Sequence, residues 1–415
     1  MNAEIIAIGS ELLTPFRQDT NSLFLTAQLN QLGVEVSFKT IVGDRRTDLV
    51  RTARTALERA DVVIFMGGLG PTEDDLTREC VAEVLGRQMT RHARIVEDLR
   101  ARFASRGWKM AENNERQADV INGAEVLDNK RGSAPGQFLH INDENGNAII
   151  ILLPGPPHEL KAMFEEQCFE RLRQLVPDQH IAFRELRIAL IGESMADKRA
   201  APIYKAAKGV ETTILAGTPG EVQLHLRAQA DSMEEAQSRV DTLASALEDE
   251  FDDAIFSDKG ETLEQIVGYY LDMRGLTLAA AESCTGGLLA ERITSIPGSS
   301  RYFLGGAVVY SNSLKTEFAD VPAQLIAEHG AVSKQVAAAL AEGIRGRCKS
   351  TFGIGITGVA GPGGGTIEKP VGLVFHALAD GNETEVIERT YPGDRDRIRR
   401  WATQMALDMV RRKMM

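Results

Sequence analysis

The stretch DVVIFMGG, residues 61–68, decides the fold class of the first part of the chain. Its apolar residues run without interruption into two glycines, which predicts a strand that is buried on both faces and ends in a turn. Similar strands alternate with segments of helical spacing. The expected strands are AEIIAIG (3–9), VEVSFKTIV (34–42) and NAIIILLPGPP (147–157), and the expected helices are 20–32, 46–60 and 158–175. This alternation predicts an α/β domain with a parallel sheet covered by helices on both faces.

Beyond this first part, the chain divides into two further segments. Near residue 180 the alternating stretches FRELRIALIG and EVQLHLRAQA predict a small α+β unit similar to a KH module, although no GxxG loop is evident in it. The polar stretch FSDKGETL (256–263) is interpreted as a linker, and strands alternate with helices again after it. We therefore predict two three-layer α/β domains with mainly parallel sheets, joined by a small α+β, KH-like domain. The expected boundaries are 1–175, 180–256 and 258–415.

The composition narrows the class of protein. With 43% hydrophobic and 26% charged residues, the chain has the profile of an ordinary globular protein. The formal net charge of −12 argues against a nucleic-acid partner. No apolar stretch approaches the roughly 18 residues of a membrane span, and the start lacks the pattern of a secretory signal. The four cysteines have no metal-ligand spacing. These features predict a cytoplasmic protein without a membrane partner.

In the last segment, three loops follow expected strands. They are AESCTGG (281–287), VVYSNSLK (308–315) and ITGVAGPGGG (356–365). Because ligands bind at the carboxyl ends of strands in open α/β sheets, we expect these loops to form one site. The glycines of the third loop allow backbone N–H groups to approach a ligand oxygen, although alone they fit a surface loop equally well.

Ser283 is the candidate nucleophile of this site. It follows a strand and precedes Thr285 and Gly286, which open a helix, and a serine hydroxyl needs an adjacent base. No histidine is suitably placed, so Lys315 is the candidate base, provided that burial or a nearby cation lowers its pKa. Cys284 is the rival nucleophile, because a helix N-terminus lowers the pKa of a thiol.

These three loops, together with AVS and YPGDRDRIRRWA, resemble the C-terminal domain of the CinA family (competence/damage-inducible protein A) over roughly residues 258–415. That domain is similar to bacterial nicotinamide mononucleotide deamidases. The resemblance implies an amidohydrolase that needs no metal or cofactor and converts nicotinamide mononucleotide (NMN) to nicotinic acid mononucleotide and ammonia. In it, Ser283 matches the nucleophile and Lys315 the base. The positions matching the substrate-binding loops are Tyr310, Asn312, Thr357, Gly358 and Ala360. Thr285 and Gly286 of the first loop are expected to bind the substrate as well.

Arg395 matches a phosphate-pocket arginine of that family. A guanidinium group at the start of a helix opposes the helix dipole, which favours a ligand explanation over a solvated surface. Asp394 is expected to cap the same helix. Arg397, Arg399 and Arg400 are expected to face water.

In the first domain, GGLGPTEDDLT (67–77) follows the strand that opened the argument. Thr72 to Thr77 are expected to open a helix, with Thr72 and Asp75 forming an approximate capping box. Capping leaves the preceding glycines unexplained. A glycine turn followed by paired carboxylates suits a phosphate held with a divalent cation. The expected phosphate or nucleotide site comprises Gly68, Gly70, Thr72, Asp74 and Asp75.

Residues 1–170 resemble the molybdopterin-binding fold (MoaB/MogA-like) found at the N-terminus of CinA proteins, through GSELL, DTNS, VGD, GGLGPTEDDLT and LPGPP. The resemblance implies metal-dependent hydrolysis of ADP-ribose, with Asp74, Asp75 and Asp44 as metal residues and Glu11 as a further candidate. One departure stands at residues 14–17, where the sequence is TPFR instead of a glycine-containing turn. Pro15 stiffens that loop. His158 is interpreted as a cap or solvated residue.

Three functions remain open at this stage. The first is a bifunctional enzyme acting on NMN and ADP-ribose. The second is a molybdopterin-binding protein, and the third is a competence or DNA-damage scaffold without turnover. The family resemblance also implies a homodimer.

Overall fold

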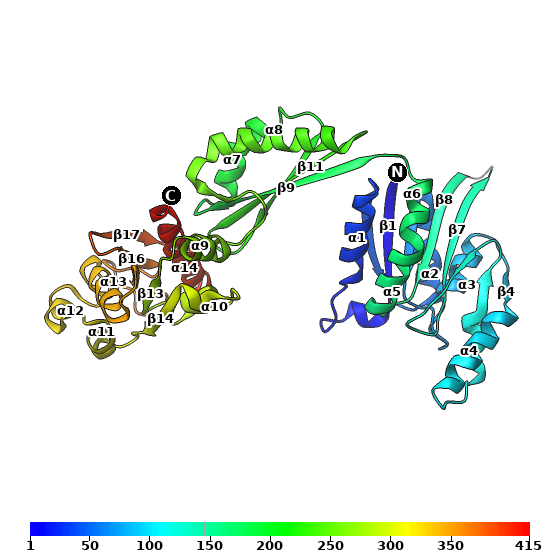
Figure 1. Ribbon diagram of the computed structural model, residues 1–415, viewed down its shortest axis with the longest axis horizontal. Coiled ribbons are helices and arrows are strands. Elements are labelled where there is room, and N and C mark those ends of the chain that lie inside the picture. The colour runs from blue at the N-terminus through cyan, green and yellow to red at the C-terminus, as the bar shows by residue number, and fades with distance from the viewer. Residues whose placement is uncertain (144–145) are drawn as a thin grey trace. The chain divides into compact units, whose positions relative to one another are not determined.

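The computed structural model describes residues 1–143 and 146–415. The chain forms two compact units (Figure 1), which are described separately below. The first comprises residues 1–181 and 229–236, and the second comprises residues 182–228 and 237–415. In the described ranges, no helix is long and apolar enough to cross a membrane.

The first unit is built on a sheet with the strand order β2-β1-β3-β8-β7-β6. Neighbouring strands from β2 to β8 run parallel, whereas β7 and β6 extend the sheet in antiparallel fashion. The strands are β1 (Asn2–Ile8), β2 (Glu35–Val42), β3 (Val62–Met66), β6 (Glu125–Leu127), β7 (Gly136–Asp143) and β8 (Gly146–Leu153). The opening stretch therefore forms the parallel strand β3 in the interior of the sheet, as its unbroken apolar run predicts.

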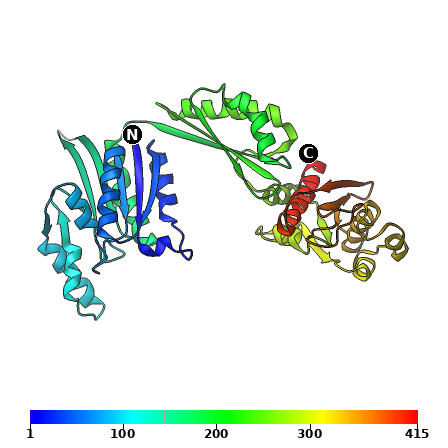
Figure 2. The ribbon, with the colours of Figure 1, turned by 180° about the vertical axis from the view of Figure 1, so that it is seen from behind.

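Helices cover both faces of this sheet (Figures 1 and 2). Alternate residues of β3 serve the two cores: Ile64 packs with α1, α5 and α6, and Phe65 packs with α2 and α3. The helices are α1 (Asn21–Gln31), α2 (Arg46–Arg59), α3 (Thr77–Val84), α5 (Pro157–Met163) and α6 (Phe169–Leu175), with a π-helical turn at Phe164–Cys168. The predicted three-layer α/β architecture is confirmed for this unit.

Between α3 and β6 the chain leaves the main sheet. Strands β4 (Met89–Arg91) and β5 (Asp119–Ile121) form a small antiparallel pair, and α4 (Ala93–Ser105) lies between them in sequence. Helix α4 buries only Val96 and Leu99. Much of its surface is therefore available to line the cavity described below.

The second unit begins with the small α+β segment. Its sheet has the order β10-β11-β9-β12, with α7 (Glu193–Tyr204) and α8 (Met233–Phe251) accompanying it. The strands are β9 (His180–Ala189), β10 (Val210–Ala216), β11 (Glu221–Ala230) and β12 (Ile255–Ser257). The predicted strands and helices of this segment are present. Its status as a separate third domain stays a prediction, because most of it lies in one compact unit with the C-terminal segment.

The C-terminal segment contains the sheet β14-β13-β15-β16-β17. Strands β14, β13 and β15 are parallel, and β16 and β17 are added in antiparallel fashion. The strands are β13 (Leu278–Glu282), β14 (Phe303–Val308), β15 (Phe352–Gly358), β16 (Leu373–Ala379) and β17 (Thr384–Thr390). One face packs on α9 (Leu263–Met273), α10 (Leu288–Thr294) and α14 (Arg395–Lys413). The other packs on α11 (Asn312–Ala319), α12 (Ala323–His329) and α13 (Lys334–Cys348).

One local prediction in this segment was wrong. Residues 308–315 were expected to form a loop, but helix α11 begins at Asn312. The Ser311 hydroxyl accepts a hydrogen bond from the Leu314 backbone N–H at 3.2 Å and thus caps the helix. Lys315 consequently lies on a helix, which restricts where its side chain can reach.

Candidate functional site

The ends of β13, β14 and β15 are held together by backbone hydrogen bonds. The Ser283 N–H donates to the Ile356 carbonyl at 2.9 Å, and the Val309 N–H donates to the Glu282 carbonyl at 2.8 Å. These bonds join the first residues of all three predicted loops, because β14 and β15 flank β13. The expectation that the loops start at one edge of the sheet therefore holds.

Lys315 is buried at this edge. Its side chain is only 2% exposed, and its ammonium group donates a hydrogen bond to the Val309 carbonyl at 3.0 Å. Val309 is itself bonded to Glu282, the residue before Ser283, so the ammonium lies next to the start of the nucleophile loop. Burial lowers the pKa of Lys315, which is the condition that the sequence analysis set for a basic role.

Ser283 and Cys284 are both largely buried, at 9% and 5% exposure. Burial raises the pKa of the Cys284 thiol to about 12. The expectation of a lowered thiol pKa at this helix N-terminus was therefore wrong, because desolvation of the thiolate outweighs the helix dipole. The thiolate is the reactive form of cysteine, so this site favours Ser283.

Glu282 has a role that the sequence analysis missed. Its buried carboxylate accepts hydrogen bonds from the backbone N–H groups of Gly287, Leu289 and Ala290, at 3.1, 3.0 and 2.9 Å. A carboxylate at a helix N-terminus satisfies unpaired donors and interacts favourably with the helix dipole. Glu282 thus fixes the turn that contains Ser283. Its position directly before that turn was the only sequence signal.

Thr285 is fully buried, and its hydroxyl has no hydrogen-bond partner among the described residues. Buried polar groups are usually paired, so an unpaired hydroxyl beside Ser283 suits a ligand contact. The Thr285 carbonyl accepts two bonds from the Arg399 guanidinium, at 3.0 and 2.7 Å. Arg399 was expected to face water. Instead it anchors the loop after Ser283, because this face of α14 packs against that loop.

The remaining predicted substrate residues lie on the loops around this edge. Thr357 is buried and donates its hydroxyl hydrogen to the Ala331 carbonyl at 2.8 Å, so that hydroxyl is already occupied. Ala360 is buried, and Gly358 is half-buried at the end of β15. Gly286 has a φ of +60°, a conformation that favours glycine, and Asn312 is exposed at the first position of α11.

Arg395 and Tyr310 are brought together although 85 positions separate them. The Arg395 guanidinium donates to the Tyr310 hydroxyl at 2.9 Å and to the Gly361 carbonyl at 3.0 Å. Both side chains are exposed, so this pair links two of the loops while leaving donors accessible to an anion. Asp394 caps α14 as predicted, accepting the Arg397 N–H at 2.9 Å.

The first unit has its own candidate site, a cavity of about 360 Å³ at the ends of β1 and β3. Most of the residues predicted for the nucleotide and metal sites line it. These are Glu11, Asp44, Gly68, Gly70, Asp74 and Asp75. The LPGPP segment contributes Pro154, Gly155 and Pro156 to the same wall. His158 is not among the lining residues, in agreement with its interpretation as a solvated side chain.

The turn after β3 differs from the predicted helix start. Helix α3 begins at Thr77, and Asp75 accepts hydrogen bonds from both the backbone N–H and the hydroxyl of Thr72. Thr72 is therefore the donor and not a helix cap. Arg78, which sequence reasoning missed, is fully buried and donates to the carbonyls of Leu69 and Gly70 at 2.7 and 3.1 Å. These contacts hold the glycine turn in one conformation.

The carboxylates of this cavity do not form a complete metal cage. Within the described residues, no three His, Cys, Asp or Glu side chains converge in a way that could hold a metal ion. The Asp44 carboxylate accepts the Ser10 N–H at 2.8 Å, and Asp75 is engaged by Thr72. Mg²⁺ is commonly held by one or two carboxylates together with ligand phosphates. The donor set fits an ion that is completed by a bound phosphate ligand.

The departure at residues 14–17 places its arginine beside this site. Arg17 lines an adjoining cavity of about 350 Å³ that shares Ile8, Glu11, Gly155 and Pro156 with the first. Phe16 is 88% exposed. The TPFR loop therefore adds a cation close to the predicted phosphate site, where the resemblance implied a glycine-containing turn.

Comparison with known proteins identifies both parts of the chain. The family model for the CinA C-terminal domain matches residues 260–414, and the model for a probable molybdopterin binding domain matches residues 4–174. A CinA-like protein of Koribacter versatilis is 63% identical over 100% of both chains. A putative competence-damage inducible protein of Moorella thermoacetica is 42% identical over 100% of this chain and 99% of its own.

Among solved structures, the competence/damage inducible protein CihA of Agrobacterium tumefaciens is 39% identical over 35% of this chain and 90% of that chain, with a TM-score of 0.35. The relatives from Koribacter versatilis and Moorella thermoacetica carry more weight, because each matches this chain over its whole length. The resemblance seen in the sequence motifs is thereby confirmed, and the chain belongs to the CinA family.

Proposed function

We propose that the C-terminal segment is an amidohydrolase that converts NMN and water to nicotinic acid mononucleotide and ammonia. The observation that carries this proposal is the burial of Lys315 beside the Ser283 loop. A lysine held in a dry environment loses its proton more readily than an exposed one and can then act as a base.

The proposed reaction uses Lys315 as the base and Ser283 as the nucleophile. Neutral Lys315 accepts the proton of the Ser283 hydroxyl while the oxygen attacks the amide carbonyl carbon. The same ammonium group then protonates the leaving nitrogen, and ammonia departs from an acyl-enzyme ester. Water hydrolyses the ester, and Ser283 regains its proton. Arg395 binds the phosphate of the nucleotide through charge-assisted hydrogen bonds.

The test is ammonia release from NMN by the full chain in the presence of EDTA. Ser283→Ala and Lys315→Ala are each expected to lower kcat by at least about 10³-fold, since the nucleophile and base act as a unit. Ser295→Ala, at the exposed C-cap of α10, and Lys334→Ala, on an exposed position of α13, are matched controls and should retain activity. A wild-type protein that releases no ammonia, or mutants that retain turnover, would contradict the proposal.

For the N-terminal unit we propose metal-dependent hydrolysis of ADP-ribose. The supporting observation is that the glycine turn and the carboxylates of Asp44, Asp74 and Asp75 line one cavity. Backbone N–H groups of such turns bind phosphate oxygens. A divalent cation held by Asp74 and Asp75 with the ligand would neutralise the charge of the pyrophosphate. The Ser10 backbone N–H donates to the Asp44 carboxylate and fixes its position in the same cavity.

The alternative for this unit is binding of a molybdopterin without turnover, which the matching family model suggests by its description. The two are separated by measuring AMP release from ADP-ribose with Mg²⁺ present. Tight pterin binding without AMP release would favour the alternative.

A further inference from the structure

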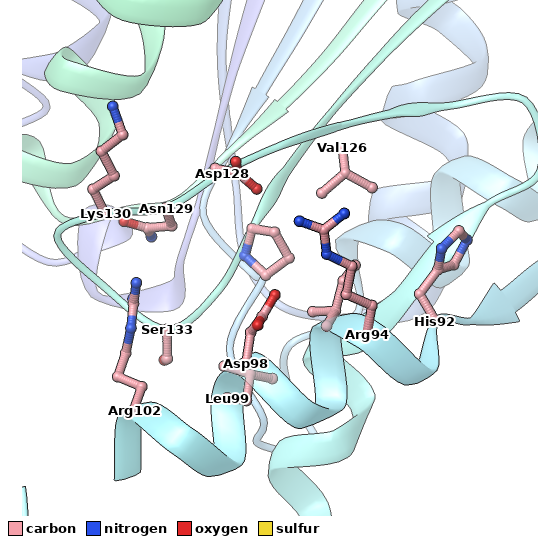
Figure 3. Close-up of a pocket in the computed structure, with 12 residues that line it drawn as sticks. His92, Arg94, Asp98, Leu99, Arg102, Val126, Asp128, Asn129, Lys130 and Ser133 are labelled. Carbon is pink, nitrogen blue, oxygen red and sulfur yellow. The ribbon is translucent and has the colours of Figure 1, made fainter. Parts of the chain in front are cut away.

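Next to the glycine-turn cavity lies a larger one, of about 580 Å³, formed by α4 and the loop between β6 and β7 (Figure 3). The two cavities share Ser133 as a lining residue. The two cavities therefore adjoin at Ser133, and a ligand that occupies both has to pass this residue. Neither the sequence motifs nor the family description assigns a role to this α4 cavity.

One wall of the α4 cavity is a row of charged residues on a single helix. Arg94, Asp98 and Arg102 are spaced four residues apart, so they project from the same face of α4, and Figure 3 shows their side chains extending from that helix. The two arginine Cα atoms are separated by about 12 Å along the helix axis. In the described part of the chain, neither arginine forms an ion pair. Each guanidinium group thus has donors available for an anion.

The opposite wall comes from β6 and the loop after it. Lys130 lies on that loop, but in Figure 3 its ammonium group points away from α4, and it pairs with Glu166 at 3.2 Å. Apolar surface on which a ribose or base can rest comes from both walls, from Leu99 on α4 and from Val126 on β6. Asp98 and Asp128 offset part of the positive charge. This balance suits a single phosphate group on an organic ligand, and it disfavours a polyanion such as a nucleic acid.

We infer that the α4 cavity is a subsite for a second phosphate on the nucleotide whose pyrophosphate occupies the glycine-turn cavity. The favoured ligand class is a dinucleotide-type pyrophosphate that also carries a phosphate on a ribose hydroxyl. Arg94 and Arg102 bind this phosphate, Ser133 lies at the junction, and the apolar wall contacts the sugar. The inference rests on the nucleotide chemistry proposed for the glycine-turn cavity.

The test compares binding of the non-hydrolysable α,β-methylene analogues of ADP-ribose and 2′-phospho-ADP-ribose, named below by the parent nucleotides, to the full chain by calorimetric titration. Mg²⁺ is present, because the carboxylates of the glycine-turn cavity need a cation to face a pyrophosphate. The wild-type protein is expected to bind the phosphorylated ligand about tenfold more tightly, the value of one charge-assisted hydrogen bond. Arg94→Ala and Arg102→Ala should remove this gain while leaving ADP-ribose affinity unchanged. Arg106→Ala, at the exposed C-cap of α4 and outside the cavity, should keep it.

Substitution of Asp98 should change the affinity for the phosphorylated ligand in the opposite direction. Asp98→Asn removes a carboxylate from between the two arginines and is expected to increase the gain, whereas Glu97→Gln, on an exposed position of the same turn, should not. Equal affinity of the wild type for the two ligands, or an equal loss in Arg106→Ala, would overturn the subsite.

Failure of the N-terminal proposal is a distinguishable outcome. If neither ligand binds, the pyrophosphate chemistry is wrong, and inorganic phosphate becomes the probe of the α4 cavity alone. Phosphate should then shift the NMR amide signals of residues 93–102 in the wild type and not in the Arg94→Ala, Arg102→Ala double variant. The absence of such shifts in the wild type would reject the anion subsite as well.

Discussion

The two candidate sites differ in how far their charged side chains are exposed to water. At the C-terminal edge, Lys315 and Glu282 are both almost fully buried, and protein groups satisfy them. In the N-terminal cavity Asp74 is exposed and Asp75 is half-buried. Buried groups can have their proton affinity set by the fold, whereas exposed carboxylates act mainly by binding cations. The difference suggests proton transfer at one site and charge neutralisation at the other.

Chelation should separate the two sites most strongly. With EDTA present, we expect AMP release from ADP-ribose to fall to background and ammonia release from NMN to stay unchanged. The reason is that the N-terminal carboxylates need a cation to bind a negatively charged pyrophosphate. The C-terminal site, with Ser283 and Lys315, contains its own base. Both products can be measured on the same sample. Loss of both activities on chelation would break the comparison.

Removing the charge of Glu282, which accepts the backbone N–H groups of the turn after Ser283, should give the next largest effect. Glu282→Gln weakens three charge-assisted bonds to backbone N–H groups, and we expect it to cost about 2 kcal/mol of unfolding free energy. A shift of the Ser283 loop by about 1 Å would also lower kcat by about 10²-fold. Urea unfolding and NMN turnover measure the two effects. Glu291→Gln, on an exposed position of α10, should change neither.

The pH dependence of NMN turnover tests the buried lysine directly. Because burial lowers the pKa of Lys315, the neutral base forms below the pH at which an exposed lysine deprotonates. We expect kcat to rise with pH and to reach its plateau before pH 10.5, the ordinary lysine value. A rate that follows an unshifted lysine titration would show that Lys315 is not the base, or that water reaches it.

The lowered pKa of Lys315 should also appear in the stability of the protein, where the buried lysine makes a destabilising contribution. A lysine with a lowered folded-state pKa binds fewer protons in the folded protein than in the unfolded chain, so its contribution to stability falls as pH falls through the folded pKa. Lys315→Met removes that penalty, and we expect it to stabilise the protein by on the order of 1 kcal/mol at neutral pH. The gain should shrink as pH rises toward 10.5. Thermal unfolding at several pH values measures it.

Much of this arrangement could be predicted from the sequence. Apolar runs predict the strand that precedes GGLGPTEDDLT and the meeting of the three C-terminal loops. The residue type of Asp394 predicts the cap of α14. Helix α11 was missed because Ser311, Asn312 and Ser313 are typical of loops as well as of helix starts.

Other features depend on contacts between distant residues. The Thr285 carbonyl meets Arg399, which lies 114 positions away, and the pKa of Cys284 depends on how completely the thiol is buried. Neither the contact between Thr285 and Arg399 nor the degree of burial of the Cys284 thiol can be read from the local sequence. The direction of the Thr72–Asp75 bond also depends on where α3 starts, and helix starts are the least certain part of a pattern.

Weakening the hydrogen bond between Thr72 and Asp75 should give the smallest of these effects, and it tests the more exposed N-terminal site. Asp75→Asn keeps an oxygen acceptor for Thr72 but removes the charge, so we expect a loss of about 0.5–1 kcal/mol, confined to the glycine turn. Hydrogen–deuterium exchange of residues 67–77 should become faster, with the C-terminal edge unaffected. Glu73→Gln, an exposed neighbour, is the control. Unchanged exchange in Asp75→Asn would mean that Arg78 alone holds the turn, and the N-terminal site would then be as preorganised as its buried counterpart.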